Sequence, residues 1–200
     1  MKLKRKWVVV LLVLLAAAAI LFGGLSYING VRNALWSKAV TDILEVTAQG
    51  RHALDTYLEK DQETLHLLAL ELAQEYTDDG ETVRGIIRLF GEDGTSYLSV
   101  DLRSGVLYTG LLEEDYPLEA GQWEVFQALT GRGVREPYLD GRTGVRTLGI
   151  YERFTFADGA EGLVQKSQPL SEIADRFSLS FYHDTGFSYV VNREGDILVR

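Results

Sequence analysis

The stretch VRTLGIYERFTFADGAEGLVQKSQ, residues 145–168, decides the fold class of this chain. Its first half, residues 145–156, is rich in β-branched and aromatic residues, which favour strands. The four residues 157–160 then read Ala-Asp-Gly-Ala, and an Asp-Gly pair between two strand-like runs predicts a hairpin turn. Residues 161–168 are then predicted to form a second strand that runs back beside the first. Two consecutive strands joined by a tight turn predict an antiparallel sheet.

Strands and helices on either side of this hairpin predict an α+β domain with a single sheet. Upstream, we expect short strands at residues 85–90, 95–100 and 106–109, followed by loop as far as Pro117. Residues 121–129 predict a short amphipathic helix that turns Trp123 and Phe126 inward. Residues 134–139 read as an edge strand or a bend, because Pro137 cannot donate to a sheet ladder. Downstream, Ser171 is a candidate N-cap for a last helix.

The first thirty residues predict a membrane anchor. Residues 7–25 carry no charged side chain, and as a helix they span roughly 28 Å, close to the thickness of a bilayer core. We expect a cytoplasmic basic tail at 1–6, a transmembrane helix at 7–28 and a body outside the cytoplasm, because positive charges stay inside. A cleaved signal peptide is the alternative, and it also places the body outside.

A long stalk helix is expected over residues 31–77, which contain no proline. Apolar or small residues recur along it in alternating steps of four and three, at Trp36, Val40, Ile43, Thr47, Gly50, Leu54 and Tyr57. This repeat favours a parallel homodimer through residues 31–57. Farther along, Leu65, Leu68 and Leu72 continue the stripe, and there we expect it to widen to Leu67 and Leu70 and to pack on its own domain.

Composition and motifs argue against several functions. The chain carries a formal net charge of -9 and no cysteine, which disfavours nucleic-acid binding and excludes disulfides and thiolate metal sites. The histidines at 52, 66 and 183 do not have metal-ligand spacing, and neither a phosphate-binding loop nor a G-x-S-x-G elbow occurs. The acidic run at 113–115 is expected to be solvated. We therefore expect no catalytic residues, no metal and no cofactor, and this chain is not predicted to be an enzyme.

Three segments resemble the Cache sensors of bacterial receptors, whose modules have a PAS-like sheet. RGVREPYLDGRTGVRTLGIYERF, residues 132–154, resembles the segment that lines the Cache pocket. GLVQKSQPLSEIADRF, residues 162–177, resembles the strand and exit helix that close the first module. GFSYVVNREGDILVR, residues 186–200, resembles the opening hairpin of the second module of double Cache domains.

The resemblance implies the domain organisation. It predicts a distal PAS-like module at 81–170, a connector helix at 171–183 and the opening hairpin of a truncated membrane-proximal module at 186–200. It also implies an extracytoplasmic sensor of a signal-transduction receptor that crosses the bacterial cell membrane once in this chain. The missing output would be a diguanylate cyclase or the histidine kinase of a two-component system. The alternative is a complete membrane-anchored or secreted binding or scaffold protein without output.

The ligand is expected to be a small molecule held between the sheet and a helix. The candidate binding residues are aromatics and arginines on the predicted strands and the short helix, namely Tyr97, Tyr108, Trp123, Arg135, Tyr138, Arg146 and Tyr151. Aromatics in such positions are also ordinary core residues, and the arginines also fit solvent-facing positions. The family's amino-acid signature is matched poorly, because no Trp-Tyr pair follows Arg135, so an amino-acid ligand is not predicted.

Overall fold

A computed structural model of the chain describes residues 2–91, 96–111, 116–141, 143–177, 190–191 and 197–199. The chain divides into two compact units, Met1–Gln49 and Gly50–Arg200. One helix, α1 (Lys2–Leu72), contributes to both units, and everything else belongs to the second. The acidic run at 113–115 and His183 lie outside the described residues.

The first unit is the N-terminal part of α1. No break separates the predicted membrane span at 7–28 from the predicted stalk at 31–77, because the helix continues through residues 29 and 30. Of the described helices, α1 alone is long and apolar enough to cross a membrane. The most apolar window has a mean hydropathy of 2.0, and none of its residues is buried. Length and composition therefore agree with the predicted anchor.

The second unit is built on one antiparallel sheet in the order β3-β2-β1-β6-β5-β4. Its strands are β1 (Ser96–Asp101), β2 (Val106–Thr109), β3 (Tyr116–Pro117), β4 (Arg132–Leu139), β5 (Arg146–Thr155) and β6 (Glu161–Pro169). The predicted hairpin is confirmed, since β6 pairs along its whole length with β5, from Thr147↔Pro169 to Thr155↔Glu161. Gly159 closes the turn at φ +81°, where a side chain would be strained. The two-residue strand β3 replaces part of the expected loop.

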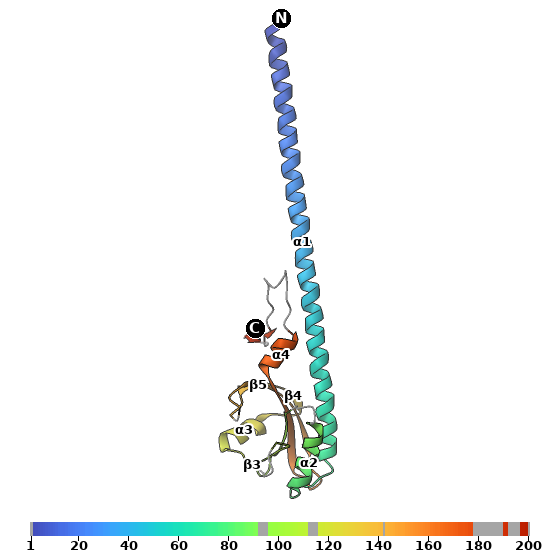
Figure 1. Cartoon of the computed structure of the whole chain (residues 1–200), viewed down its shortest axis with the longest axis vertical. Helices are drawn as coiled ribbons and strands as arrows, with labels where there is room; N and C mark the ends of the chain where they lie inside the picture. The colour runs from blue at the N-terminus through green and yellow to red at the C-terminus, as the bar shows by residue number, and fades with distance from the viewer. Residues whose placement is uncertain are drawn as a thin grey trace. The chain divides into compact units, whose positions relative to one another are not determined.

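Helices cover both faces of this sheet (Figure 1). On one face the end of α1 and the helix α2 (Gly80–Phe90) pack against the sheet through a buried cluster that includes Leu65, Leu68 and Val83. On the other face lies α3 (Ala120–Ala128), whose Phe126 packs against Leu98 among other residues of a second cluster. The predicted helix at 121–129 is thus confirmed, and it lies on the opposite side of the sheet from α1.

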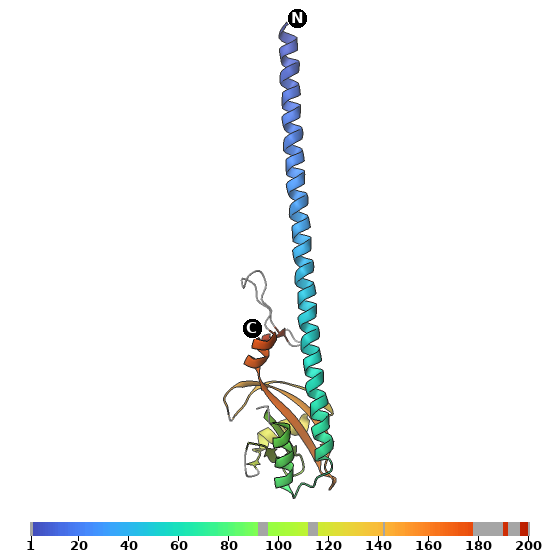
Figure 2. The same ribbon diagram turned by 45° about the vertical axis from the view of Figure 1, so that its right-hand side comes forward.

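The helix α2 corrects a prediction, because residues 85–90 were expected to form a strand. Figure 2 shows α2, in green, as a separate helix beside the end of α1. Asp79 starts it by accepting a hydrogen bond from the backbone N–H of Thr82 (3.1 Å), which makes it the N-cap. The hydroxyl of Thr82 (2.8 Å) and, to a smaller extent, this N–H lower the pKa of the Asp79 carboxyl by donating to it. Val83 and Ile87, four residues apart, are its buried residues. The β-branched pair at 86–87 suggested a strand, but the N-cap and the helical spacing of the buried residues favour a helix.

The end of α1 also differs from the prediction. The helix ends at Leu72 rather than Thr77. Leu65, Leu68 and Leu72 are buried as expected, whereas Leu67 and Leu70 are 58% and 51% exposed. The buried stripe is therefore narrow, because the sheet contacts only one side of the helix.

Polar contacts join the segment after α1 to the β5–β6 turn. The hydroxyl of Thr77 donates to Oδ2 of Asp158 (2.5 Å), and Arg103 donates to the same oxygen (3.0 Å). The hydrogen bonds from Thr77 and from the backbone N–H of Ala160 lower the pKa of the Asp158 carboxyl to about 2, with a smaller contribution from Arg103. The backbone N–H of residue 157 also donates to the carbonyl of Glu75 (2.9 Å). The turn is therefore held against the end of α1.

The last described elements are α4 (Leu170–Phe177), β7 (Val190–Val191) and β8 (Ile197–Val199). Ser171 lies inside the first turn of α4 rather than capping it, because the helix begins at Leu170. Beyond residue 177, the rest of the predicted connector helix at 171–183 lies outside the described residues. β7 and β8 pair antiparallel, as the hairpin prediction required. Within the predicted hairpin, residues 186–189, 192–196 and 200 are not among the described residues.

Candidate functional site

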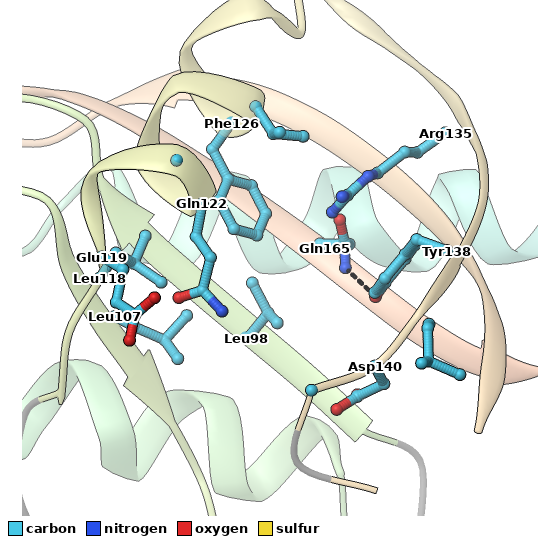
Figure 3. A pocket seen from close by; sticks show the side chains of 14 residues that line it. Leu98, Leu107, Leu118, Glu119, Gln122, Phe126, Arg135, Tyr138, Asp140 and Gln165 are labelled. Carbon is cyan, nitrogen blue, oxygen red and sulfur yellow. Dashed lines mark hydrogen bonds between the residues drawn. The ribbon is translucent and has the colours of Figure 1, made fainter. Parts of the chain in front are cut away.

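A cavity of about 650 Å³ lies between α3, β4 and the sheet face that α3 covers. Figure 3 shows it open between the α3 side chains and those of β4, with the sheet behind. Its apolar lining comes from four sheet and loop leucines and two α3 residues: Leu98, Leu107, Leu118, Leu139, Val125 and Phe126. Its size is that of a small-molecule site.

A bulge in β4 places two side chains in this cavity. Arg135 pairs with Gly149 and Tyr138 with Thr147, so three steps along β4 match only two along β5. Without the extra residue, positions 135 and 138 would point to opposite faces of the strand. With it, both line the cavity. Pro137 lies within the bulge and cannot donate to a ladder, so the sequence prediction of a bent edge strand is confirmed.

Arg135 is the basic group of the cavity wall. Its guanidinium lies 3.9 Å from the ring centre of Tyr138 and 5.5 Å from that of Phe126. Burial lowers the pKa of this guanidinium, which the adjacent Tyr138 partly opposes. Among the described residues no carboxylate forms an ion pair with it. A half-buried cation held only by aromatic faces is suited to an anionic group that enters from outside.

The floor of the cavity is an amide network on β6. Nε2 of Gln165 donates to the hydroxyls of Tyr138 (2.8 Å) and Ser167 (3.0 Å), which lie 3.1 Å apart. The other end of the amide, Oε1, is fully buried and has no hydrogen-bond partner. Figure 3 shows Gln165 beneath Arg135, with its nitrogen turned to Tyr138. A buried carbonyl oxygen without a hydrogen-bond partner costs free energy, so the floor holds this amide at a cost in stability.

Gly149 makes room for this amide. A Cβ built at Gly149 would lie 2.9 Å from both Cδ and Oε1 of Gln165, closer than side-chain carbons pack. The absence of a side chain on β5 therefore allows Gln165 to lie flat on the floor.

The opening of the cavity is polar. Glu119 and Gln122, at the start of α3, and Asp140, just after β4, line it. Oδ1 of Asp140 accepts a hydrogen bond from the backbone N–H of Thr143 (3.2 Å), which holds the turn after β4. These groups give the opening an acidic character that the floor lacks.

The structure separates the seven predicted site residues. Arg135 and Tyr138 line the cavity together. Tyr97 and Tyr108 are buried on the other face of the sheet, in the cluster packed against α1 and α2. The hydroxyl of Tyr108 donates to the carbonyl of Thr77 (2.9 Å), and burial raises the pKa of this phenol to about 12. Both tyrosines therefore lie outside this cavity, because strand alternation points them away from α3.

The other three predicted residues do not line the cavity either. Trp123 donates its indole N–H to the carbonyl of Leu102 (3.0 Å), which fixes α3 to the turn after β1. Tyr151 shares the pocket face of the sheet, where it pairs with Gln165 in the register, but it packs in the apolar cluster beside the cavity. Arg146 is exposed at the start of β5.

Sequence reasoning missed Gln165, Gln122 and Gly149. A signal for Gln165 was present, since four polar residues in a row, QKSQ at 165–168, end a predicted strand. Gly149 and Gln122 gave no comparable signal, because their roles depend on which residue lies opposite. Among the described residues no group of three or more histidine, aspartate or glutamate side chains is placed to hold a metal ion.

No protein-family model matches the chain, and no curated protein matches it. Solved structures do. The ligand-binding domain of the Pseudomonas aeruginosa amino-acid chemoreceptor PctC, in complex with GABA, superposes with a TM-score of 0.64 at 17% identity over 78% of this chain and 73% of that chain.

The sensory domain of the Campylobacter jejuni chemoreceptor Tlp3 matches with a TM-score of 0.66 at 11% identity, over 82% of this chain and 72% of that one. The ligand-binding domain of the Pseudomonas fluorescens chemoreceptor CtaA, in complex with L-leucine, matches with a TM-score of 0.57 at 19% identity, over 74% of this chain and 63% of that one. Identities this low establish a shared fold and nothing finer. The chain therefore has the α+β fold of bacterial chemoreceptor sensory domains, and the predicted likeness to Cache sensors is confirmed at the level of fold.

Proposed function

We propose that the cavity under α3 binds a small molecule and that the chain is the extracytoplasmic, non-catalytic sensing region of a membrane receptor. The observation that carries the proposal is Arg135, a half-buried cation that faces a cavity of ligand size and has no carboxylate partner among the residues that the structure describes. Support from comparison is the shared fold with domains solved in complex with GABA or L-leucine.

The floor of the cavity and the Arg135 wall favour an acidic ligand with an apolar body, whereas Glu119 and Asp140 line the opening. A carboxylate would replace the hydration that Arg135 loses on burial. The planar guanidinium of Arg135 can donate to both oxygens of a carboxylate at once. The leucines and Phe126 would hold the apolar part. Beside Arg135 the floor offers the neutral amide of Gln165 rather than a carboxylate, so the floor itself provides no counter-charge for an ammonium group.

A thermal-shift experiment with paired probes tests both statements. The probes are L-leucine with 4-methylpentanoate, and GABA with butyrate, where the second member of each pair lacks the amino group. A ligand at about 100 times its Kd stabilises a folded protein by about 2.7 kcal/mol. We expect a shift with the acids that lack the amine. A shift confined to L-leucine or GABA would instead give the chain amino-acid specificity.

Substitutions locate the site. Arg135→Ala and Tyr138→Ala should abolish the shift produced by a stabilising probe while the domain stays folded. Arg146→Ala is the matched control, because it removes the same charge from an exposed position on the adjacent strand. A probe shift that survives in both pocket variants would rule this cavity out as the binding site.

The membrane and signalling parts of the proposal rest on α1 and on sequence. Residues 7–28 would cross the bacterial membrane with the N-terminus in the cytoplasm, and residues 31–57 would pair in a parallel homodimer. A second module begun at 186–200 and a diguanylate cyclase or histidine kinase output would follow in the coding sequence. Sequencing beyond codon 200 tests this, and a stop codon there would contradict the receptor.

Dimerisation has its own test, because the chain lacks cysteine and single cysteines can be introduced cleanly. Val40→Cys lies on the 4-3 stripe and should cross-link in membranes under mild oxidation. Lys38→Cys, on the other side of the helix, should not. Equal cross-linking at both positions would contradict a specific helix pair.

A further inference from the structure

Strand β6 carries four consecutive polar residues that are all buried. The exposed fractions of Gln165, Lys166, Ser167 and Gln168 are 0%, 7%, 6% and 6%. The strand is central, with β1 on one side and β5 on the other. Burying polar groups in such a strand costs free energy unless each finds a partner. The partners therefore show what this run of residues connects.

The four residues alternate between two faces, as strand geometry requires. Gln165 and Ser167 face the cavity, where both contact the hydroxyl of Tyr138. Lys166 and Gln168 face α1. Nζ of Lys166 donates to Oδ1 of Asp61 (2.6 Å), and the hydroxyl of Tyr57 donates to Oε1 of Gln168 (2.6 Å). One strand segment thus bonds to the cavity floor on one face and to the long helix on the other.

The helix side of this arrangement is concentrated on one turn of α1. Tyr57 and Asp61 are four residues apart and so lie on the same side of the helix. The Tyr57 ring also meets Arg176 and Phe177 of α4, at 4.9 Å from the guanidinium and 5.3 Å between ring centres. Lys166 itself lies 5.4 Å from the centre of the same ring. This turn is the place where α1, β6 and α4 meet.

Stability alone does not account for a buried ion pair at this place. Replacing such a pair with apolar residues of similar volume is often neutral or stabilising, because both charges lose their hydration when buried. Here hydrogen bonds offset only part of the cost of removing Asp61 from water, since its Oδ2 is buried without a hydrogen-bond partner. The pair instead supplies a directional hydrogen bond between strand and helix. Such a bond fixes their relative position more closely than an apolar contact does.

We propose that residues 165–168 of β6 couple the cavity floor to α1, with the Asp61–Lys166 bond as the essential link. A change in the position of Gln165 alters the backbone of a strand whose next residue is bonded to the helix. The hydrogen bonds that join β6 to Tyr57 and Asp61 of α1 then change as well. The biological meaning rests on the proposed ligand site, but the coupling itself is testable without any ligand.

Gly149→Ala serves as the perturbation. Its added Cβ would lie 2.9 Å from the Gln165 amide, and because the amide is the far end of a flexible side chain, it moves rather than the backbone of β5. Gln165 then loses its bonds to Tyr138 and Ser167. Gln165→Met, which keeps the length of the side chain and removes both donors, is the second perturbation if the first does not fold.

The experiment is hydrogen–deuterium exchange of the whole 200-residue chain in lipid nanodiscs. We expect Gly149→Ala to speed exchange of the α1 backbone amides at residues 57–65 by at least about fivefold, the lower end of coupling between sites. In an Asp61→Val/Lys166→Met background, which replaces the link with an apolar pair, the same perturbation should change exchange there by less than about twofold. Gln165→Met should reproduce both results.

The control applies the same substitutions to an exposed pair on the same helix. Arg51 and Asp55 lie 3.6 Å apart with most of both side chains in solvent. In Arg51→Met/Asp55→Val the response to Gly149→Ala should persist in full.

Two results would overturn the coupling. One is exchange that rises in β4 and β5 around the cavity while residues 57–65 of α1 stay unchanged. The other is a helix response that persists without the Asp61–Lys166 link. Neither result bears on the thermal shifts of the acid probes, so failure of the coupling and failure of the binding site are separate outcomes.

Discussion

Replacing Lys166 by Met removes the cation from the buried pair between β6 and α1. Both side chains are about nine-tenths buried, at 9% and 10% exposed, and the two atoms that pair are 2.6 Å apart. Asp61 already has one buried oxygen without a partner. After the substitution neither oxygen of the Asp61 carboxylate has a hydrogen-bond partner. Water cannot reach this carboxylate unless the contact between helix and sheet opens.

The expected cost is about 3–5 kcal/mol, the range for breaking a buried ion pair by removing one partner. For a unit of roughly 150 residues, each kcal/mol lowers Tm by about 2–4 °C, so the loss is about 6 to 20 °C. Asp61→Val/Lys166→Met removes both charges and should recover most of this, because no charge is left buried. Arg51→Met, in an exposed pair, should cost at most about 0.5 kcal/mol.

Thermal unfolding of the detergent-solubilised chain, followed by circular dichroism, measures these differences. The four proteins should rank with wild type, the double variant and Arg51→Met close together and Lys166→Met far below. A loss of less than about 1 kcal/mol in the free energy of unfolding of Lys166→Met would refute the reasoning, since a buried carboxylate without a partner should cost more than that. A double variant as unstable as the single one would show that packing, not charge, is what the substitution disturbs.

Three further predictions concern the framework of the domain. Gly162→Ala should destabilise it by about 1–3 kcal/mol in a urea titration, because the new Cβ would lie 2.6 to 2.7 Å from two packed phenyl rings, and an unchanged midpoint would contradict that packing. Asp79→Ala removes the N-cap of α2 and should lower the urea midpoint of unfolding, whereas Asp79→Ser should recover part of the loss; equal losses would mean that no cap operates. Asp158→Asn should destabilise the domain at neutral pH. Because the folded-state pKa of Asp158 is depressed to about 2, its contribution is complete above the unfolded value near 4 and is lost as pH falls through 2. Unfolding midpoints of Asp158→Asn and wild type should therefore converge on acidification, and a constant gap would contradict the assignment.

Local sequence predicted the elements whose signals are local. The β5–β6 hairpin follows from strand-like runs on either side of an Asp-Gly turn, and both its register and its left-handed glycine agree with that prediction. The edge position of β4 followed from Pro137 alone. In contrast, residues 85–90 have strand-like composition, and a side-chain cap six residues earlier decides for a helix. Local propensity is weak where capping and burial oppose it.

The candidate site was only partly accessible from sequence. Arg135 and Tyr138 were found because both sit in a segment with a recognisable pattern. That they face the same cavity depends on the β4 bulge, which shifts one residue to the other face. Tyr97 and Tyr108 lie on the sheet face opposite the cavity, and a strand pattern does not reveal this, because it gives alternation without saying which side the ligand occupies.

By itself the sequence determined the long apolar helix, the antiparallel hairpin and the absence of cysteine chemistry, since each depends on a run of neighbouring residues. Tertiary structure decided the pairing of Lys166 with Asp61 and the space that Gly149 leaves for Gln165. Each of these joins residues far apart in the chain. Their distances are set by strand order and helix packing, which no local pattern encodes.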